Sequence, residues 1–421
     1  EVEIRSPQES QRKGIACIHQ EQKLVPDLSI SENILMANGF QGNNFIINYE
    51  RAYNISKKLL YEVGLHLDPN TKVRNLTMGQ KYLVEVAKAL SVDAQLIAMD
   101  ETTASLTDKE IKILKNIIDN LRKKQVSVIF ISHKLDEVLD IADRITVLRD
   151  GNTVGTLLRE ECTREKLIKL MIGKEYKDFI PKSSSKVGEE VLRVEHITAG
   201  NVVKDVSFNV RKGEILGITG LVGSGKSELA NIIFGIDSKD SGEIYINNKR
   251  VKIRNPRDAI KNKLGLIPED RMLQGLVLGM TVSDNIVMSI LDKISSIGCI
   301  NFDVQSFVAK EYISKLNIKV RNEYQHVFKL SSGNQQKVLI SRLLSINPKV
   351  LIMDEPTRGL DIVSKKQIYE LIYMLSQEGI ASILISTDFK EILSLSNRIL
   401  VMKEGRIVGE LSNGEASQEK I

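Results

Sequence analysis

The chain has 421 residues, enough for two domains that each bury a core, and its 42% hydrophobic and 27% charged content is that of an ordinary soluble globular protein. A formal net charge of +5 without long runs of one sign argues against nucleic acid as a partner, and no apolar run approaches the ~18–20 residues that span a bilayer. Three isolated cysteines, Cys17, Cys162 and Cys299, indicate neither a disulfide framework nor a zinc cluster, which fits a reducing cytosol.

Two apolar runs in the first half end in polar side chains that suit phosphate chemistry. LIAMDE (96–101) has the form of a buried parallel strand and ends in Asp100 and Glu101. One carboxylate there can hold Mg²⁺ through water, and the next can polarise an attacking water. SVIFISH (127–133) places His133 at the end of another strand, where it suits a sensor of a γ-phosphate. Taken alone, the acidic pair could be a strand-end turn and the histidine an incidental polar residue.

Residues 173–190, GKEYKDFIPKSSSKVGEE, are polar, charged and rich in serine, without the periodicity of a helix or strand. This composition predicts a linker between a first domain over 1–172 and a second domain over 191–421. A solvated loop within one domain is the alternative interpretation.

The stretch GLVGSGKS (220–227) occurs once and matches the pattern of a phosphate-binding loop. It follows a predicted buried strand, EILGITG (214–220), and precedes a predicted helix that ends at Gly235, which is the context this motif needs. Backbone N–H groups of the loop favour phosphate; we expect Lys226 to reach the β- and γ-phosphates and Ser227 to ligate Mg²⁺. The residues expected to bind the nucleotide here are Gly220, Leu221, Val222, Gly223, Ser224, Gly225, Lys226 and Ser227.

The second half of the chain repeats the first. The matched pairs are LTMGQ (76–80) with LSSGN (330–334), AMDETTASLT (98–107) with MDEPTRGLD (353–361), and VLRDG (147–151) with VMKEG (401–405). All share an offset of 254 residues, whereas IHQE (18–21) matches IPED (267–270) at 249, so the second copy gains about five residues in between. We interpret the chain as a tandem duplication, in which Asp354 and Glu355 repeat Asp100 and Glu101 and Thr387 replaces His133.

A phosphate loop of the first copy would fall before Glu1 by the same offset, and Ile421 maps short of the first copy's end. We therefore expect the chain to begin inside its first domain and to stop early in its second. Natural loss of one loop is the alternative.

The phosphate loop, the LTMGQ and LSSGN turns and the strand-end Asp-Glu pairs, in this order, resemble the nucleotide-binding domains of ABC ATPases over essentially the whole chain. Two cassettes in one polypeptide, with PEDR (268–271), SSGNQQKV (331–338) and DEPTRGLD (354–361) in the second, resemble the ATP-binding subunits of bacterial monosaccharide importers. The resemblance implies an α/β fold of two tandem P-loop ABC ATPase domains, each with a mixed sheet core and a helical subdomain.

In such proteins each ATP lies between the phosphate loop of one cassette and the signature turn of the other. ATP on residues 220–227 would therefore face residues 76–80, with the Thr77 hydroxyl and the Gly79 N–H donating to its γ-phosphate. The resemblance assigns further nucleotide contacts to Thr77, Gly79, Gln80, Ser331, Gly333, Gln20 and Glu269. It assigns Mg²⁺ binding to Ser227, Asp354, Asp100 and Gln20, and catalysis to Glu101, His133 and Glu355.

The two halves differ in the residues that the resemblance makes hydrolytic. The first has Gln20, Glu101 and His133, whereas the second has Glu269 and Thr387 in place of the glutamine and the histidine. The second cassette is thus expected to bind ATP well and to hydrolyse it slowly or not at all.

The resemblance implies a peripheral protein at the cytoplasmic face of the membrane, whose cassettes close on ATP. Its partners would be membrane permease subunits, docked between Gln20 and Leu76 and between Glu269 and Leu330, and through them an extracytoplasmic sugar-binding protein. No nucleic acid is expected. The alternatives are an importer of nucleosides or autoinducer-2, a soluble twin-cassette ATPase that acts on ribosomes, and a DNA-repair ATPase.

Overall fold

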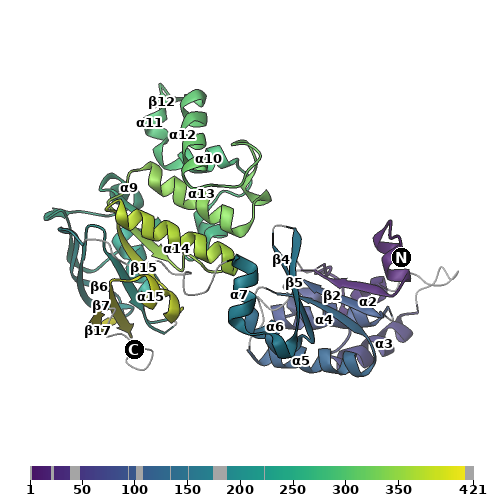
Figure 1. The fold of residues 1–421 in the computed structure, drawn as a ribbon. Helices are drawn as coiled ribbons and strands as arrows, with labels where there is room; N and C mark the ends of the chain where they lie inside the picture. The colour runs from purple at the N-terminus through teal and green to yellow at the C-terminus, as the bar shows by residue number, and fades with distance from the viewer. Residues whose placement is uncertain are drawn as a thin grey trace. The chain divides into compact units, whose positions relative to one another are not determined.

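The computed structural model describes residues 2–19, 23–37, 48–92, 94–100, 108–132, 134–149, 151–173, 187–221 and 223–412. The chain divides into two compact units, Glu1–Glu175 and Tyr176–Ile421 (Figure 1). The division falls within the predicted linker 173–190; because residues 174–186 lie outside the described part, the linker stays a prediction. None of the described helices is both long and apolar enough to cross a bilayer.

The second unit is built on a six-stranded sheet of order β11-β14-β15-β8-β16-β17. Its strands are β8 (Ile215–Thr219), β11 (Leu264–Ile267), β14 (Val350–Asp354), β15 (Ala381–Ile385), β16 (Arg398–Lys403) and β17 (Arg406–Ser412). The first five pair in parallel and β17 pairs antiparallel to β16, so the sheet is mixed. Every residue of β8, β14 and β15 is buried, as expected for parallel strands that are covered on both faces.

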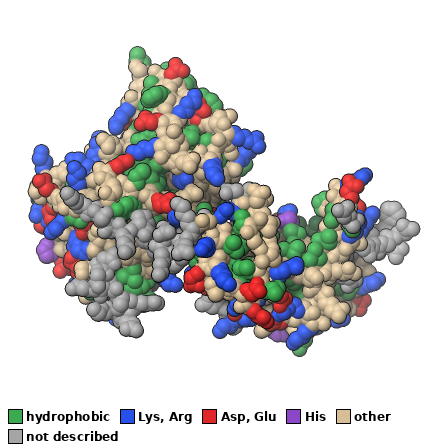
Figure 2. Space-filling model, viewed as in Figure 1, with side chains coloured by type: hydrophobic (Ala, Val, Ile, Leu, Met, Phe, Trp, Pro, Cys, Tyr) green, Lys and Arg blue, Asp and Glu red, His purple; other side chains and the backbone are tan. Residues whose placement is uncertain are grey.

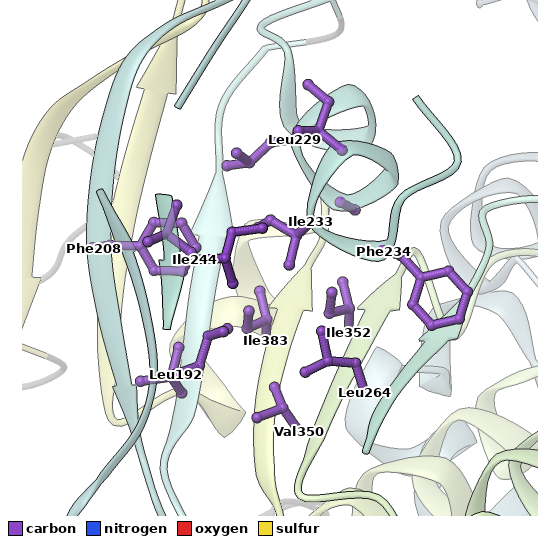
Figure 3. Close-up of a cluster of buried hydrophobic side chains, with 14 of the residues drawn as sticks. Leu192, Phe208, Leu229, Ile233, Phe234, Ile244, Leu264, Val350, Ile352 and Ile383 are labelled. Atoms are coloured by element: carbon purple, nitrogen blue, oxygen red, sulfur yellow. The ribbon is translucent and has the colours of Figure 1, made fainter. Parts of the chain in front are cut away.

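A second, antiparallel sheet of order β10-β9-β6-β7 covers one face of the first. Its strands are β6 (Glu190–Ala199), β7 (Val203–Arg211), β9 (Ser241–Ile246) and β10 (Lys249–Val251). Leu192 and Phe208 from this sheet and Ile352 and Ile383 from the six-stranded sheet belong to one core cluster with Ile233 of α8 (Lys226–Phe234) (Figure 3). Burying each such side chain contributes about 1.5–3 kcal/mol, so this core accounts for much of the unit's stability.

The other helices of the second unit form a helical subdomain and cover the sheet. They are α9 (Pro256–Lys261), α10 (Val282–Val287), α11 (Leu291–Ile294), α12 (Phe302–Lys315), α13 (Ser332–Ser345), α14 (Ile362–Gln377) and α15 (Phe389–Leu395), with the π-helix η4 (Arg271–Gly275) and the 3-10 helices η5 (Met288–Ile290) and η6 (Val327–Lys329). A hairpin of β12 (Ser295–Ser296) and β13 (Cys299–Ile300) joins α11 to α12. Buried Asn285 closes the loop before α10, because its amide accepts from Val277 N (3.0 Å) and donates to the carbonyl oxygens of Val277 (3.0 Å) and Thr281 (2.9 Å).

The described part of the first unit contains two separate sheets, β1-β2-β3 and β4-β5. Its strands are β1 (Ile15–Ile18), β2 (Leu96–Asp100), β3 (Ser127–Ile131), β4 (Arg144–Arg149) and β5 (Asn152–Leu158). Its helices are α1 (Pro7–Arg12), α2 (Ile30–Ala37), α3 (Tyr49–Glu62), η1 (Val73–Asn75), α4 (Met78–Leu90), α5 (Asp108–Lys123), α6 (Leu135–Ile141), η2 (Arg159–Glu161) and α7 (Arg164–Ile172). β1, β2 and β3 pair in parallel in the same order as β11, β14 and β15, which is the arrangement the repeat predicts.

The structure locates the residues that the second copy gains. Asn33 makes the bonds of Asn285 252 positions earlier: it accepts from Val25 N (2.8 Å) and donates to the carbonyl oxygens of Val25 (3.1 Å) and Ser29 (2.9 Å). The offset is thus 249 at β1 and β11 and 252 at this asparagine, so three extra residues lie between them, where the second unit has the π-helix η4. Such π-helical insertions are frequent at functional sites.

Charged side chains on the face shown in Figure 2 mix both signs, with Lys and Arg interspersed among Asp and Glu. The face in this view thus has the mixed charge that the composition predicts.

Candidate functional site

The phosphate loop runs from the end of β8 into α8, and it closely approaches other parts of the second unit. Gly220 has φ +153°, and a Cβ on it would lie 2.1 Å from Met402 O. Gly225 caps α8 with φ +96°, and a Cβ on it would lie 2.6 Å from Val202 O. Any larger residue at either position would therefore displace the loop, since both contacts are with backbone atoms.

The Lys226 ammonium is enclosed by the loop itself. Its Nζ donates to Gly220 O (2.7 Å), Leu221 O (2.9 Å) and Ser224 Oγ (3.0 Å), and the residue is buried. Burial lowers the pKa of Lys226, while the carboxylates of Glu355 and Asp354 act to raise it. A lysine whose described hydrogen-bond partners are all neutral oxygens is ready to pair with an anion that enters the loop.

Asp354 ends β14 beside the loop and is 4% exposed. Its Oδ1 is buried and has no hydrogen-bond partner among the described residues, and the Ser227 hydroxyl hydrogen-bonds to the carboxylate. Burial raises the pKa of Asp354 to about 6, helped by the nearby charges of Glu269 and Glu355. An unsatisfied carboxylate oxygen beside a serine hydroxyl is the donor set that Mg²⁺ prefers, so these two residues fit a magnesium site.

Glu355 follows Asp354 in a strained backbone conformation, with φ +46°. Its Oε1 accepts from Thr387 N (2.6 Å), and its Oε2 lies 3.4 Å from Ser386 Oγ. Both partners come from the residues directly after β15, so the ends of two neighbouring strands hold this carboxylate.

Glu269, in the loop after β11, forms an ion pair with Arg358, and Arg271 donates to Arg358 O at 2.8 Å. These contacts tie the loop after β11 to the loop after β14. The charge of Glu269 lies close enough to raise the pKa of both Lys226 and Asp354, although its own side chain is engaged by Arg358.

The two turns LTMGQ and LSSGN each begin a helix, α4 in the first unit and α13 in the second. Thr77 caps α4 in a capping box, in which its hydroxyl accepts from Gln80 N (3.3 Å) and the Gln80 side chain accepts from Thr77 N (2.9 Å). Ser331 is the N-cap residue of α13, where its Oγ accepts from the Asn334 side chain (3.0 Å). The first turn of each helix presents backbone N–H groups, which favour bound anions.

The glycine in each turn permits close approach of a second helix. A Cβ on Gly79 would lie 1.6 Å from Glu110 Oε1 of α5, and a Cβ on Gly333 would lie 2.4 Å from Ser364 Oγ of α14. Glu110 and Ser364 occupy the same place in the repeat, 254 residues apart, so the contact is duplicated with a different side chain.

A family model described as ABC transporter matches residues 2–104 and 203–358. The chain belongs to the ABC transporter family. One matched segment lies in each unit, so the chain carries two ABC cassettes in tandem, and the predicted α/β fold class is confirmed.

Relatives match along essentially the whole chain. "Ribose import ATP-binding protein RbsA" of Caldanaerobacter subterraneus subsp. tengcongensis is 44% identical over 421 residues, covering 100% of this chain and 85% of that protein. "Xylose import ATP-binding protein XylG" of Moorella thermoacetica is 45% identical over 421 residues, covering 98% and 83%. A solved structure titled as a nucleotide-free ATP-binding cassette from an ABC transporter is 26% identical with a TM-score of 0.46, covering 53% of this chain and 91% of that one.

The structure gathers part of the predicted ABC site in the second cassette. Gly220, Ser224, Lys226, Ser227, Asp354 and Glu355 lie together around the phosphate loop. Asp100 ends β2 of the first cassette, as Asp354 ends β14. Gln20, Glu101, His133 and Val222 lie outside the described residues.

Sequence reasoning missed three residues that contact or approach this site: Arg358, Ser386 and Glu391. Ser386 lies beside Glu355, and Glu391 accepts from Ser386. The repeat carried a signal for both, because Ser132 and Glu137 precede them by 254 residues. The repeat gave no signal for Arg358, since Ala104 occupies the matching position of the first cassette, although Arg358 lies within the motif DEPTRGLD.

Proposed function

We propose that this chain is the ATP-binding subunit of an ABC importer for monosaccharides. The observation that carries the proposal is the cluster of Lys226, Ser227 and Asp354 around a phosphate loop, in a chain of this family. The names of its relatives, ribose or xylose import ATP-binding proteins, support a sugar as the transported solute.

Mg²⁺ and ATP are the ligands that this cluster suits. Ser227 and Asp354 would hold the metal, which supplies charge neutralisation at the transferring phosphoryl group. Lys226 would exchange the loop oxygens that it now contacts for those of the phosphates. Glu355 would orient the attacking water, while the neighbouring loop positions the phosphate and excludes bulk solvent.

The second half of the site is proposed to come from the first cassette. In a head-to-tail closed state, ATP on the second cassette's loop would meet the N-terminus of α4, where Thr77 and Gly79 would donate to the γ-phosphate. Closure would gain contacts with the nucleotide that the open state lacks, so ATP would shift the equilibrium towards the closed state. Permease subunits at the membrane would convert that shift into alternating access.

We propose that the two sites are unequal. The second cassette pairs Glu269 with Arg358 where the first has Gln20 and Ala104, and it has Thr387 where the first has His133. A carboxylate that is paired with an arginine is less able than a glutamine amide to contact Mg²⁺ at the site. The second site is therefore proposed to bind ATP and to turn it over slowly.

The test is ATP binding and turnover by the chain assembled with its permease and an extracytoplasmic sugar-binding protein. Lys226→Ala is expected to weaken ATP binding to the second cassette about tenfold or more, because it removes a charged hydrogen-bond donor. Lys249→Ala, at an exposed lysine of β10, is the matched control and should leave ATP binding unchanged.

The solute is tested in the same assembly. Turnover stimulated by ribose, xylose or galactose together with the binding protein supports the proposal. Stimulation by nucleosides or autoinducer-2 alone supports a different importer. Stimulation by ribosomes without the permease contradicts transport altogether.

A further inference from the structure

A buried carboxyl group lies behind the acidic end of β14 in the second cassette. It belongs to Glu391 of α15, which is 2% exposed. Glu391 Oε1 accepts from Thr357 Oγ1 at 3.0 Å, and Oε2 accepts from Ser386 Oγ at 2.7 Å. Both hydroxyl groups belong to buried residues, so the carboxyl group is solvated by protein rather than by water.

Ser386 joins this group to Glu355. Its hydroxyl lies 2.7 Å from Glu391 Oε2 and 3.4 Å from Glu355 Oε2, and it accepts from Asp388 N at 3.0 Å. A serine hydroxyl has one proton to donate and two lone pairs that accept. One hydroxyl proton cannot form a strong hydrogen bond with two carboxylates at once. The shorter distance shows that Ser386 donates to Glu391 in this structure.

The two oxygens of the Glu355 carboxylate therefore have partners of different kinds, one fixed in position and one able to rotate. Glu355 Oε1 accepts from the backbone N–H of Thr387 at 2.6 Å, a donor that cannot turn away. Glu355 Oε2 faces the Ser386 hydroxyl, which rotates. Whether Oε2 accepts from Ser386 or from water depends on where that one proton points.

The charged groups that face Glu391 do not compensate its charge directly. Burial raises the pKa of Glu391 to about 7; the Ser386 and Thr357 hydroxyls and Lys365 of α14 oppose this, and Asp388 adds to it. Lys365 itself pairs with Asp388 at 3.5 Å. The carboxyl group thus changes its protonation state within the physiological pH range.

We propose that Glu391 is a positioning residue for Glu355 and acts by accepting or releasing the hydrogen bond that the Ser386 hydroxyl donates. When Glu391 is ionised, Ser386 donates to it, and Glu355 Oε2 is open to water. When Glu391 takes a proton from solvent, it donates to Ser386, whose own proton turns to Glu355 Oε2. Ser386 Oγ then accepts from both Glu391 and Asp388 N, which its two lone pairs allow. This inference rests on the proposed role of Glu355 in hydrolysis.

The first cassette offers a matched control in which the same acid has a different neighbour. Glu137 repeats Glu391, and its Oε2 lies 3.4 Å from Ser132 Oγ. Lys134 lies 3.0 Å from Glu137 Oε1 and stands where the second cassette has Asp388. The matched acid is thus paired with a cation in the first cassette, and the hydrogen-bond switch is proposed for the second cassette only.

The test measures ATP turnover against pH in the full chain with its transport partners, in a Glu101→Gln background that leaves hydrolysis to the second site. The parent should show an inflection near pH 7, with turnover falling as pH drops. Glu391→Gln, whose amide donates to Ser386 at every pH, should lack the inflection and turn over about tenfold more slowly at pH 8, with KM for ATP unchanged. Ser386→Ala should also lack the inflection but exceed Glu391→Gln at every pH. An inflection that survives in Glu391→Gln overturns the inference.

A second measurement needs no hydrolysis. In an Asp354→Asn background, which removes the other buried carboxyl group of raised pKa, the infrared band of a protonated acid should appear as pH falls through 7. That band should be absent when Glu391→Gln is added and retained when Glu137→Gln is added. Persistence of that band in Glu391→Gln also overturns the inference. A band that behaves as expected, together with no ATP turnover in the parent of the turnover test, contradicts the hydrolytic part of the proposed function and leaves the hydrogen-bond switch in place.

Discussion

Strands β15 and β3 occupy the same place in the repeat and have similar sequences, ASILI (381–385) and SVIFI (127–131), yet their surroundings differ. Ile383 and Ile385 are each 1% exposed, whereas Ile129 and Ile131 are 50% and 48% exposed. The alternation in β3 shows that one face of this strand is uncovered among the described residues of the first unit.

The difference in exposure between β15 and β3 comes from β8 and from the elements that pack around it in the second unit. In the second unit β8 pairs with both β15 and β16, and α8 and the antiparallel sheet cover the apolar face beside it. The described part of the first unit has no strand between β3 and β4, and Leu148 of β4 is 68% exposed where Met402 of β16 is 1% exposed. The apolar pattern of a strand therefore predicts which of its side chains can be buried. Whether they are buried depends on the elements that pack beside the strand.

The largest expected effect is a charge placed on this face. In the chain of 421 residues, Ile383→Asp should lower the free energy of unfolding by about 4 kcal/mol or more, because it buries an unpaired carboxylate. Ile129→Asp at the matched position should cost less than about 1 kcal/mol, since water reaches it. Denaturant unfolding followed for each unit checks the contrast; equal costs would break it.

The next effect concerns stability against pH. The pKa of Glu391 is raised from 4.5 to about 7, so the folded state binds its proton more tightly than the unfolded state. Its contribution, about 3 kcal/mol, is fully present below about pH 4.5 and is lost as pH rises through 7. Glu391→Gln should flatten the pH dependence of the unfolding free energy. A slope that is the same in the variant and the parent would contradict this.

The glycines of the two signature turns, Gly79 and Gly333, give a smaller expected difference in stability between the two units. Gly333→Ala should cost about 1–3 kcal/mol, because Ser364 is short and donates to Asp361 Oδ2 at 2.6 Å, which holds it against the new methyl group. Gly79→Ala should cost less, because the longer Glu110 side chain can swing aside. Thermal unfolding of the two variants distinguishes them, and a larger loss in Gly79→Ala would reverse the expected order.

The smallest effect is expected at the ion pair of Glu269 and Arg358. Both side chains are substantially exposed, so Arg358→Ala should change the unfolding free energy by less than about 1 kcal/mol. Arg358→Ala should instead change the affinity for Mg²⁺-ATP, because it releases the Glu269 side chain from its ion pair. A double-mutant cycle with Glu269→Gln measures the coupling, and a coupling above about 1 kcal/mol would contradict the estimate.

Most of the features that could be predicted from the sequence came from the repeat and from short local motifs. The strand, loop and helix around GLVGSGKS appear as predicted, and α8 ends at Phe234, with Gly235 in a left-handed conformation. These features depend on residues near one another in sequence, whose turn and capping chemistry is local. The hydrogen bonds of Glu391 were missed because Thr357 precedes it by 34 residues, and only folding brings Thr357 to the segment that holds Ser386 and Glu391.

The amino-acid sequence by itself determined the tandem repeat, the strand, loop and helix around GLVGSGKS, and which residues are candidates for phosphate binding, because periodicity and short motifs are properties of the chain. The tertiary structure decided which apolar strands are buried, which oxygen of Asp354 has no partner among the described residues, and which carboxylate accepts the hydrogen bond of Ser386. Those outcomes depend on distances between residues far apart in sequence, and hydrogen bonding and burial act only through such distances.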